Sequence, residues 1–231
     1  FISEMIQMRG RVIRFRFPWI FVGSILICII FLPFVNAKTK YPRTIPVLKA
    51  AYSGQIQAFH TYMAYAEKAN SENYPNIANL FVSLATSESI HARNFKNLLS
   101  ELGVAVKEER NLQIEVSSTK KNLKRATEVE LKEIDTQYPE FIQKIEPERC
   151  EAAIRNITYA WKAQRQHRDL IQKIRSGTGI LFGLLAKKIE EKPAHYFVCQ
   201  NCGSTLTKLP KDNCPICGGS VSSYKKIEKI F

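Results

Sequence analysis

Residues 75–103 read PNIANLFVSLATSESIHARNFKNLLSELG. Apolar residues recur here every three or four positions, which predicts one amphipathic helix. Pro75 suits a first helical position and Gly103 a helix end, so the stretch carries its own start and stop signals. Glu88 and His91 lie about one turn apart on the apolar stripe, so both are expected on the buried face. Because burying a carboxylate without a partner is costly, this pair indicates a compensating charge nearby.

Three more stretches between Thr44 and about Ser176 show the same pattern, in which polar residues interrupt an apolar stripe. The third helix is expected from about Thr119 to Ile145, and the fourth is expected to begin near Pro147. The inward polar positions outside the second helix are Gln55, Glu130, Glu133, Gln164 and His167. Four such helices predict an all-α four-helix bundle, and the connection over residues 103–118 is long enough for a crossover.

Carboxylates and histidines on inward faces need positive charge or hydrogen-bond partners. A metal cluster would supply the charge. A buried network of Glu, Gln, His and Tyr side chains is the alternative. His91 and His167 stand at matching positions, three residues after Glu88 and Gln164. This repetition favours the metal.

The C-terminal segment contains two C-x-x-C hooks, Cys199 with Cys202 and Cys214 with Cys217, separated by 11 residues. Four thiolates with this spacing can form a tetrahedral site for Zn²⁺ or for a single iron. A glycine follows each hook and allows a tight turn. Two disulfides are the alternative interpretation. Iron would make this segment an electron carrier, whereas zinc would give it a structural role.

Composition and length set the domain organisation. Lys and Arg outnumber Asp and Glu by 34 to 21 in 231 residues, and the excess is spread along the chain. This distribution favours a solvated basic surface over nucleic-acid binding. The length suits one medium domain and one small one. We expect the bundle over residues 44–176, a charged linker over 177–193 and the four-cysteine domain over 194–231.

Residues 1–37 are typical of an export or anchoring segment. Four arginines, at positions 9, 11, 14 and 16, precede a nearly unbroken apolar run over residues 19–35. Small residues end the run before Lys38, which fits signal-peptide cleavage; a retained membrane anchor and a core helix are the alternatives. With either an export signal or an anchor, the arginines stay in the cytoplasm. The rest of the chain is then expected outside it, in the cell envelope or periplasm.

The order of these motifs matches a known pattern. A di-iron carboxylate bundle takes one Glu from each of two helices and a Glu-x-x-His motif from each of the other two. The corresponding residues here are Gln55, Glu88-x-x-His91, Glu130 and Gln164-x-x-His167, with the cysteine hooks behind them. Residues 54–58 (GQIQA), 85–92 (ATSESIHA) and 138–141 (YPEF) support the match. The chain resembles the rubrerythrin family over residues 46–231.

The resemblance implies a ferritin-like bundle whose di-iron centre reduces hydrogen peroxide. Electrons would arrive through a rubredoxin-like iron held by the four cysteines, from an unknown electron donor. The resemblance also implies a homodimer in which the C-terminal domain of one subunit approaches the bundle of the other.

The resemblance further implies a role for each matching residue. Glu88 would bridge the irons, Glu130 would be a terminal ligand and His167 would bind the second iron. Glu133 and His91 would exchange as ligands of one iron when its oxidation state changes. The tyrosines that would hydrogen-bond near the cluster are Tyr62 and Tyr138.

Two positions depart from the family pattern. Gln55 replaces a terminal glutamate, and Gln164 replaces the second bridging glutamate. A glutamine offers a neutral carbonyl oxygen and bridges two cations poorly. We therefore expect weaker binding or a single metal in the bundle. The cysteine loop is one residue shorter than usual and lacks the common aromatic residue after Gly203, so zinc in place of iron stays an alternative.

Three functions follow from these observations. The first is a rubrerythrin-like oxidoreductase that acts on hydrogen peroxide. The second is a non-catalytic metal-binding envelope protein with a degenerate di-iron site. The third is a zinc-binding module joined to a basic bundle that binds an anionic polymer; export argues against nucleic acid as that polymer.

Overall fold

The computed structural model describes residues 40–107, 112–175 and 195–228. The expected export segment and linker lie outside these ranges. Within the described ranges, no helix is both long enough and apolar enough to cross a membrane.

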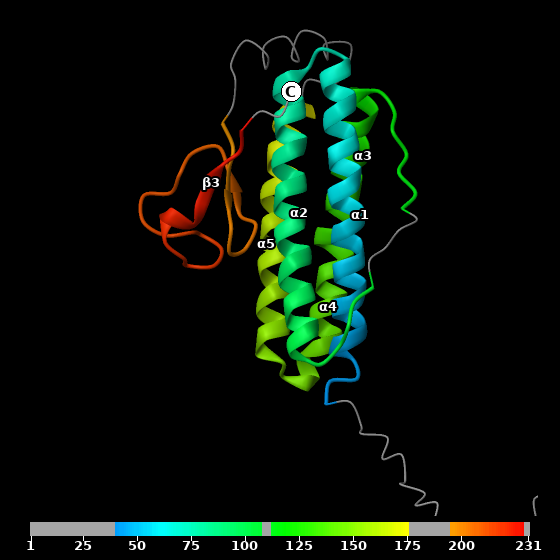
Figure 1. The fold of residues 1–231 in the computed structure, drawn as a ribbon, viewed down its shortest axis with the longest axis vertical. Helices are drawn as coiled ribbons and strands as arrows, with labels where there is room; N and C mark the ends of the chain where they lie inside the picture. Colours follow the sequence, from blue (N-terminus) through cyan, green and yellow to red (C-terminus); the bar gives the residue numbers. More distant parts are fainter. Residues whose placement is uncertain (1–39, 108–111, 176–194, 229–231) are drawn as a thin grey trace, which may run out of the picture. The chain divides into compact units, whose positions relative to one another are not determined.

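Four long helical segments form the bundle (Figure 1). They are α1 (Thr44–Ser71), α2 (Pro75–Glu101), a composite third segment of α3 (Thr119–Lys132), η1 (Glu133–Gln137) and α4 (Tyr138–Ile145), and α5 (Glu151–Arg175). Their apolar faces pack into two clusters. One contains Phe81 and Leu123, and the other contains Phe95 and Ile157. The polar residues predicted from the interrupted stripes lie between these clusters along each helix, so the bundle has a polar layer within an apolar core.

The connection between α2 and α3 is a crossover. Its described residues run beside α1 and return the chain to the end of the bundle where α2 began, so α2 and α3 point in the same direction (Figure 1). The Gln57 side-chain amide donates a hydrogen bond of 3.0 Å to the backbone carbonyl of Gln113. This bond attaches the crossover to α1.

The third helical segment has the expected bounds, Thr119 to Ile145, but it is not uniform. Residues Glu133–Gln137 form a π-helical turn. Pro139 follows and lacks the N–H that a regular α-helix would donate to Asp135, so the wider turn agrees with its chemistry. The Trp161 indole donates a 2.9 Å hydrogen bond to the Ile134 carbonyl and secures this turn from α5.

The fourth helix begins later than expected. Pro147 belongs to the short 3₁₀ turn η2 (Glu146–Glu148), Arg149 adopts a left-handed conformation with φ of 50°, and α5 begins at Glu151. The turn has a separate use, because Glu148 accepts hydrogen bonds from the backbone N–H groups of Arg43 and Thr44 at 2.7 and 2.8 Å. Glu148 thereby caps the N-terminus of α1, whose first N–H groups have no partners within the helix.

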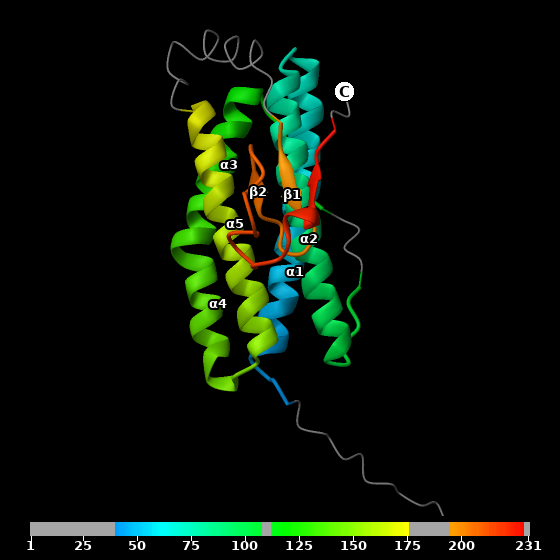
Figure 2. The same cartoon turned by 90° about the vertical axis from the view of Figure 1, so that its left-hand side faces the viewer.

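The C-terminal domain is built on a small antiparallel sheet. Its strands are β1 (Phe197–Cys199), β2 (Thr205–Leu206) and β3 (Tyr224–Lys226), in the order β2-β1-β3, with the 3₁₀ turn η3 (Val221–Ser223) before β3. Figure 2 shows β1 and β2 lying against α2 and α5. The first cysteine hook therefore faces the side of the bundle that carries His91 and His167.

Candidate metal centres

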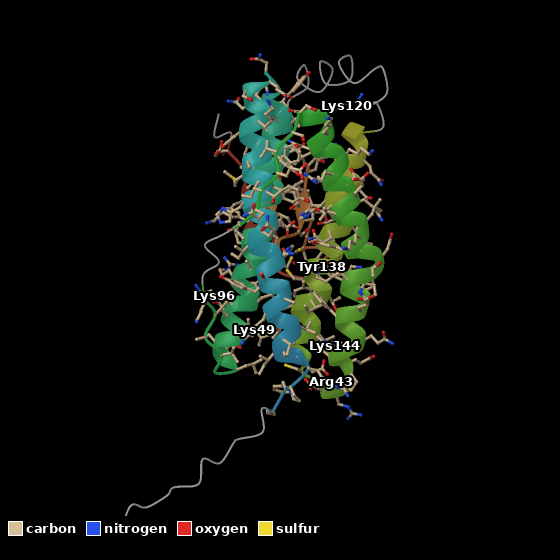
Figure 3. All side chains as sticks on the ribbon, turned by 90° about the vertical axis from the view of Figure 1, so that its right-hand side faces the viewer. Arg43, Lys49, Lys96, Lys120, Tyr138 and Lys144 are labelled. Carbon is tan, nitrogen blue, oxygen red and sulfur yellow. The ribbon has the colours of Figure 1, made fainter. Side chains whose placement is uncertain are left out.

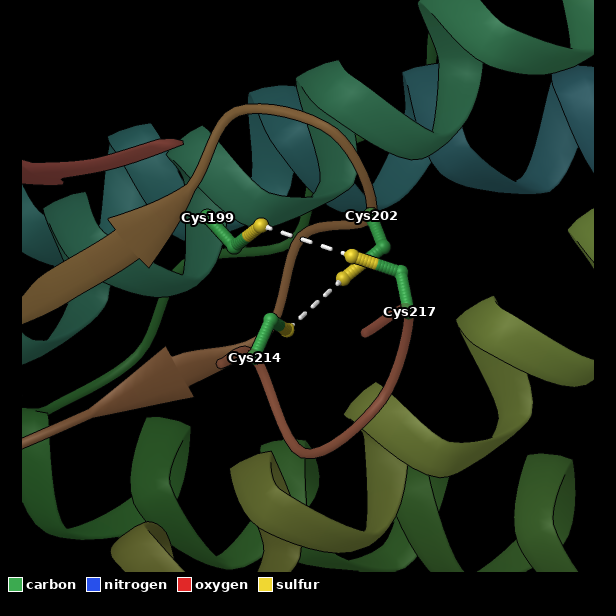
Figure 4. Close-up of side chains that lie close together, drawn as sticks. All are labelled: Cys199, Cys202, Cys214 and Cys217. Atoms are coloured by element: carbon green, nitrogen blue, oxygen red, sulfur yellow. Dashed lines mark hydrogen bonds between the residues drawn. The ribbon is translucent and has the colours of Figure 1, made fainter. Parts of the chain in front are cut away.

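The four cysteines form one compact cluster (Figure 4). The sulfurs of Cys199 and Cys217 are 3.9 Å apart and those of Cys202 and Cys214 are 3.5 Å apart, and all four lie within 4.8 Å of one another. Metal–sulfur bonds of about 2.3 Å in a tetrahedron place sulfurs about 3.8 Å apart. The cluster therefore fits a single tetrahedral metal ion. The five cysteines in the described ranges are all free, so the disulfide interpretation is wrong.

The backbone of the hooks explains this geometry. Gly203 and Gly218 have φ of 77° and 72°, a region that favours glycine. Each glycine N–H closes a turn by bonding to the carbonyl of the first cysteine of its hook, at 2.9 Å in both hooks. The backbone N–H groups of Ser204 and Cys217 donate hydrogen bonds to the sulfurs of Cys202 and Cys214. Such bonds stabilise thiolates and tune the metal that they hold.

The bundle helices bring the predicted ligands into one buried layer. The seven residues, all of them buried, are Gln55, Glu88, His91, Glu130, Glu133, Gln164 and His167. Tyr138 points between the helices toward this layer, whereas Lys49 and Lys96 point outward (Figure 3). Sequence periodicity therefore located the buried polar positions, and the structure shows how they pair.

Around His167 the layer is open for a metal ion. His167 Nδ1 lies 3.1 Å from Glu88 Oε1 and 3.6 Å from Glu130 Oε1, and one donor atom from each residue falls within 4.8 Å of the others. Glu88 Oε1 and His167 Nδ1 face each other as an ion pair, while Glu130 Oε2 and Gln164 Oε1 have no hydrogen-bond partner among the described residues. Carboxylate oxygens and an imidazole nitrogen that converge are ligands that iron uses, so Glu88, Glu130 and His167 fit a metal.

Around His91 the layer is closed by hydrogen bonds. His91 Nδ1 is 2.9 Å from Gln55 Oε1 and 3.0 Å from Glu88 Oε2. The Gln55 amide donates to the Tyr138 hydroxyl at 3.1 Å. This half matches the alternative interpretation, a hydrogen-bond network. The two halves thus differ, and the half around His167 is the better metal site.

Two further contacts orient the carboxylates. The Tyr62 hydroxyl donates a 2.6 Å hydrogen bond to Glu130 Oε1, as the resemblance implied. The Gln164 amide donates a 2.6 Å bond to Glu133 Oε2, which holds Glu133 beside the layer. The Tyr138 hydroxyl instead accepts a hydrogen bond from the Gln55 amide. Both glutamines therefore donate hydrogen bonds through their side-chain N–H groups, which an ionised carboxylate in the same position could not do.

Electrostatics divide the carboxylates into two kinds. Burial by itself would raise the pKa of Glu88, but His167 and His91 outweigh burial and lower this pKa to about 2. Burial would lower the pKa of His167, yet Glu88 and Glu130 raise it to about 10. Burial raises the pKa of Glu130, and burial together with nearby carboxylates raises the pKa of Glu133 well above its usual range. Without a cation, the layer therefore holds one ion pair and disfavours further negative charge.

The cysteine loop touches the bundle layer directly. His91 Nε2 lies 3.0 Å from the carbonyl oxygen of Cys202. Ser87 donates a 2.7 Å hydrogen bond to the carbonyl of Gly203, and the Thr205 hydroxyl is 3.4 Å from His167 Nε2. Both candidate metal centres are thus joined by one histidine and one cysteine carbonyl.

Several residues that hold the cysteine loop against the bundle were not predicted from the sequence. The Asn94 amide donates to the Asn201 carbonyl at 2.7 Å, and the Arg93 guanidinium donates to the Gln200 carbonyl. Gln166 accepts from the Thr205 backbone N–H at 3.0 Å. These are ordinary polar residues on α2 and α5, and nothing in their spacing distinguishes them from a solvated helix face.

Comparison with known proteins agrees with this geometry. The family model described as Rubrerythrin matches residues 46–175. Rubrerythrin-2 of Clostridium acetobutylicum is 32% identical over 186 residues, covering 78% of this chain and 94% of that protein. Rubrerythrin of Porphyromonas gingivalis is 30% identical, covering 85% and 96%.

A solved structure described as the fully reduced, all-ferrous state of nigerythrin superposes with a TM-score of 0.67 at 26% identity, covering 84% of this chain and 91% of that one. This likeness confirms the fold class, a ferritin-like four-helix bundle followed by a rubredoxin-like four-cysteine domain. The family binds non-haem iron at a di-iron site and at a four-cysteine site, and its members are oxidoreductases. The chain belongs to the rubrerythrin family.

Proposed function

We propose that this protein reduces hydrogen peroxide in the bundle with electrons that arrive through the four-cysteine site. The contact between His91 Nε2 and the Cys202 carbonyl is the observation that carries the proposal, because it joins the two candidate centres by a single 3.0 Å hydrogen bond. An electron donor would reduce the cysteine site from outside. The overall reaction takes one peroxide, two electrons and two protons to two waters.

The protein's own residues would support this reaction in distinct ways. Glu88, Glu130 and His167 would hold iron, which supplies the one-electron redox chemistry when bound. Tyr62 fixes Glu130 through its 2.6 Å hydrogen bond. Burial and the neighbouring carboxylates raise the pKa of Glu133, and Glu133 would be the carboxyl group that donates a proton to a departing oxygen.

A non-catalytic iron-binding protein is the second candidate. It is favoured by the closed half of the layer, where Gln55 and Glu88 both contact His91 Nδ1 and Gln55 brings no charge. In that case a single metal would sit near His167 without turnover.

Reoxidation of the cysteine site separates the two candidates. The iron-loaded protein would be reduced chemically and mixed with hydrogen peroxide, while the visible absorption of the ferric thiolate site is followed. We expect fast return of the colour in the native protein and slow return in Glu88→Gln, which leaves all four cysteines intact. Equal, slow rates in both proteins would favour the non-catalytic candidate. A colourless protein with zinc at the cysteines would exclude the electron route.

We also propose that the protein acts outside the cytoplasm, in the cell envelope or periplasm. The arginines before residue 19 and the apolar run over residues 19–35 support this proposal. Cell fractionation and N-terminal sequencing of the mature protein would test it, and recovery of the uncleaved chain in the cytoplasm would contradict it. The homodimer implied by the family likewise stays a prediction. Within one chain, the C-terminal domain already contacts its own bundle through His91 and Cys202, which differs from the expected approach to the other subunit.

A further inference from the structure

A pocket opens on the face of the bundle formed by α1, α3 and the crossover, which is the face turned toward the viewer in Figure 3. Its volume is about 370 Å³. Thr61 and Tyr62 line it from α1, Ala126 and Val129 line it from α3, and Glu133 lines it from the π-helical turn. The cysteine loop lies against α2 and α5 instead, so the pocket reaches the bundle layer from another side.

Glu133 connects this pocket to the candidate metal layer. Of the seven layer residues, which all fall in the described ranges, Glu133 is the most exposed at 9%, whereas the others are 2% exposed or less. Glu133 also accepts a hydrogen bond from the amide of Gln164, a second residue of the layer. The pocket wall is therefore where the buried layer comes closest to solvent.

Gly54 leaves the pocket unfilled. It lies in the middle of α1, where a glycine costs roughly 0.5–1 kcal/mol relative to alanine. A Cβ placed on Gly54 would meet no atom within 4 Å, so a side chain there would extend into open space beside the pocket. Neither a turn nor close packing requires this glycine. Keeping the space free is a use that the structure offers for it.

We propose that this pocket is the port through which a small uncharged hydroperoxide reaches the bundle layer, and that Gly54 keeps the port open. The identity of the ligand rests on the proposed function; the access route does not. Arg125, the cation of the described lining, is paired with Glu115, and the remaining ionisable group is Glu133, so the lining offers no free positive charge to an anion. A volume of this size would hold about a dozen water molecules, so a small alkyl hydroperoxide also fits.

Thiol labelling tests access without any metal in the bundle. The test uses a Glu133→Cys variant whose four-cysteine site is filled with metal, so that those thiols are protected. A small methanethiosulfonate reagent would label the introduced thiol, and peptide mass spectrometry would follow the rate of labelling. Gly54→Trp should slow labelling by about tenfold or more, because its ring fills the space in front of the thiol. Gly54→Ala should leave the rate within about twofold. Lys49→Trp places the same ring on an exposed position of α1 and should also have no effect.

A variant on the opposite wall of the pocket provides an independent test in case Gly54→Trp does not fold. Val129→Trp on α3 should slow labelling as Gly54→Trp does, and circular dichroism would verify that each variant is helical. An unchanged labelling rate in a folded variant of either wall would overturn the port.

Peroxide consumption then separates the port from the proposed function. In the iron-loaded protein, Gly54→Leu should lower the rate of tert-butyl hydroperoxide consumption more than the rate of hydrogen peroxide consumption. If labelling slows but the native protein consumes neither peroxide, the port stands and the proposed function fails. Equal slowing of both peroxides would contradict size selection at the port.

Discussion

Gly203 lies where the two candidate metal centres meet. A Cβ on this residue would come within 2.3 Å of His91 Nε2 and 2.7 Å of Ser87 Oγ, and His91 is itself held by Gln55 and Glu88. Alanine at this position must therefore push the cysteine loop away from α2.

We expect Gly203→Ala to slow peroxide-driven reoxidation of the cysteine site by about tenfold, while the iron content stays unchanged. Gly218→Ala is the matched control, because Gly218 has a similar φ of 72° but its Cβ would meet no atom within 4 Å. The Gly218→Ala variant therefore introduces the same backbone strain but no steric clash. Equal effects of the two variants in stopped-flow absorption would assign the loss to strain alone.

Gln55 and Gln164 should set the number of metals in the bundle. We expect Gln55→Glu combined with Gln164→Glu to raise bundle iron from about one to about two per chain, since each change adds a negative ligand. Metal analysis after subtraction of the cysteine-bound iron measures this. Gln113→Glu makes the same substitution on the exposed crossover, where it adds one negative charge away from the layer, and should leave the iron count unchanged. An unchanged count in the double variant would show that the glutamines are not limiting.

The sequence could predict which residues are buried here but not how they pair. The stripes placed Gln55, Glu88 and His91 inward because helical periodicity fixes the face of each residue. They could not show that Gln55 turns its carbonyl to His91 while Gln164 turns its amide to Glu133. Those choices depend on side chains from other helices, and an amide fits either way.

At the scale of elements, the start of α1 depends on a distant turn. Glu148 caps its first N–H groups, and although partial desolvation raises the pKa of Glu148, the hydrogen bonds from Arg43 and Thr44 outweigh this and lower it. A lowered pKa means that the stabilising contribution is present above the unfolded pKa of about 4.3 and is lost as pH falls through the folded value.

We therefore expect Glu148→Gln to lower the free energy of unfolding by about 0.5–1 kcal/mol at neutral pH, the usual size of a capping contribution near the surface. The difference between variant and native protein should shrink below about pH 4. Urea unfolding at several pH values measures both effects. Glu146→Gln, on the same turn, should behave as the native protein does; a comparable loss there would contradict the capping role.

The turn and the π-helix also show why element boundaries were hard to predict. Pro147 is a common first residue of a helix, so the sequence favoured a start there. The structure uses it in a 3₁₀ turn that carries Glu148 to α1 instead. The widened turn at Glu133–Gln137 likewise depends on a bond from Trp161, which no local pattern in α3 reveals.

At the scale of the whole molecule, the metal-free bundle should become less stable as pH rises. The pKa values of Glu130, Glu133 and His167 are raised in the folded state. A group whose pKa is raised by folding contributes fully to stability at pH values below its pKa in the unfolded chain, about 4.3 for Glu and 6.5 for His. This contribution is lost as the pH rises through the pKa in the folded protein. Glu88 has a lowered pKa, so its contribution to stability grows with rising pH, but only at acidic pH, below the pKa of an unfolded glutamate.

We expect the free energy of unfolding of protein with metal-filled cysteines and an empty bundle to fall between about pH 5 and pH 9. Iron in the bundle should remove or reverse this trend, because ligands bind metal in their deprotonated forms. Chemical denaturation across this range measures both states. Glu133→Gln should flatten the metal-free curve, and a flat curve in the native protein would argue against the raised pKa values.

The docked cysteine loop and the pocket give the bundle layer two separate approaches. The loop covers the side formed by α2 and α5, and the pocket opens between α1 and α3. A redox partner seated on the C-terminal domain would leave the pocket unobstructed, so both reactants could occupy the protein at once. Steady-state kinetics would then show parallel lines, because the reduced protein reacts with the oxidant whether or not the partner is bound, and competitive inhibition between a bulky partner and the oxidant would be absent.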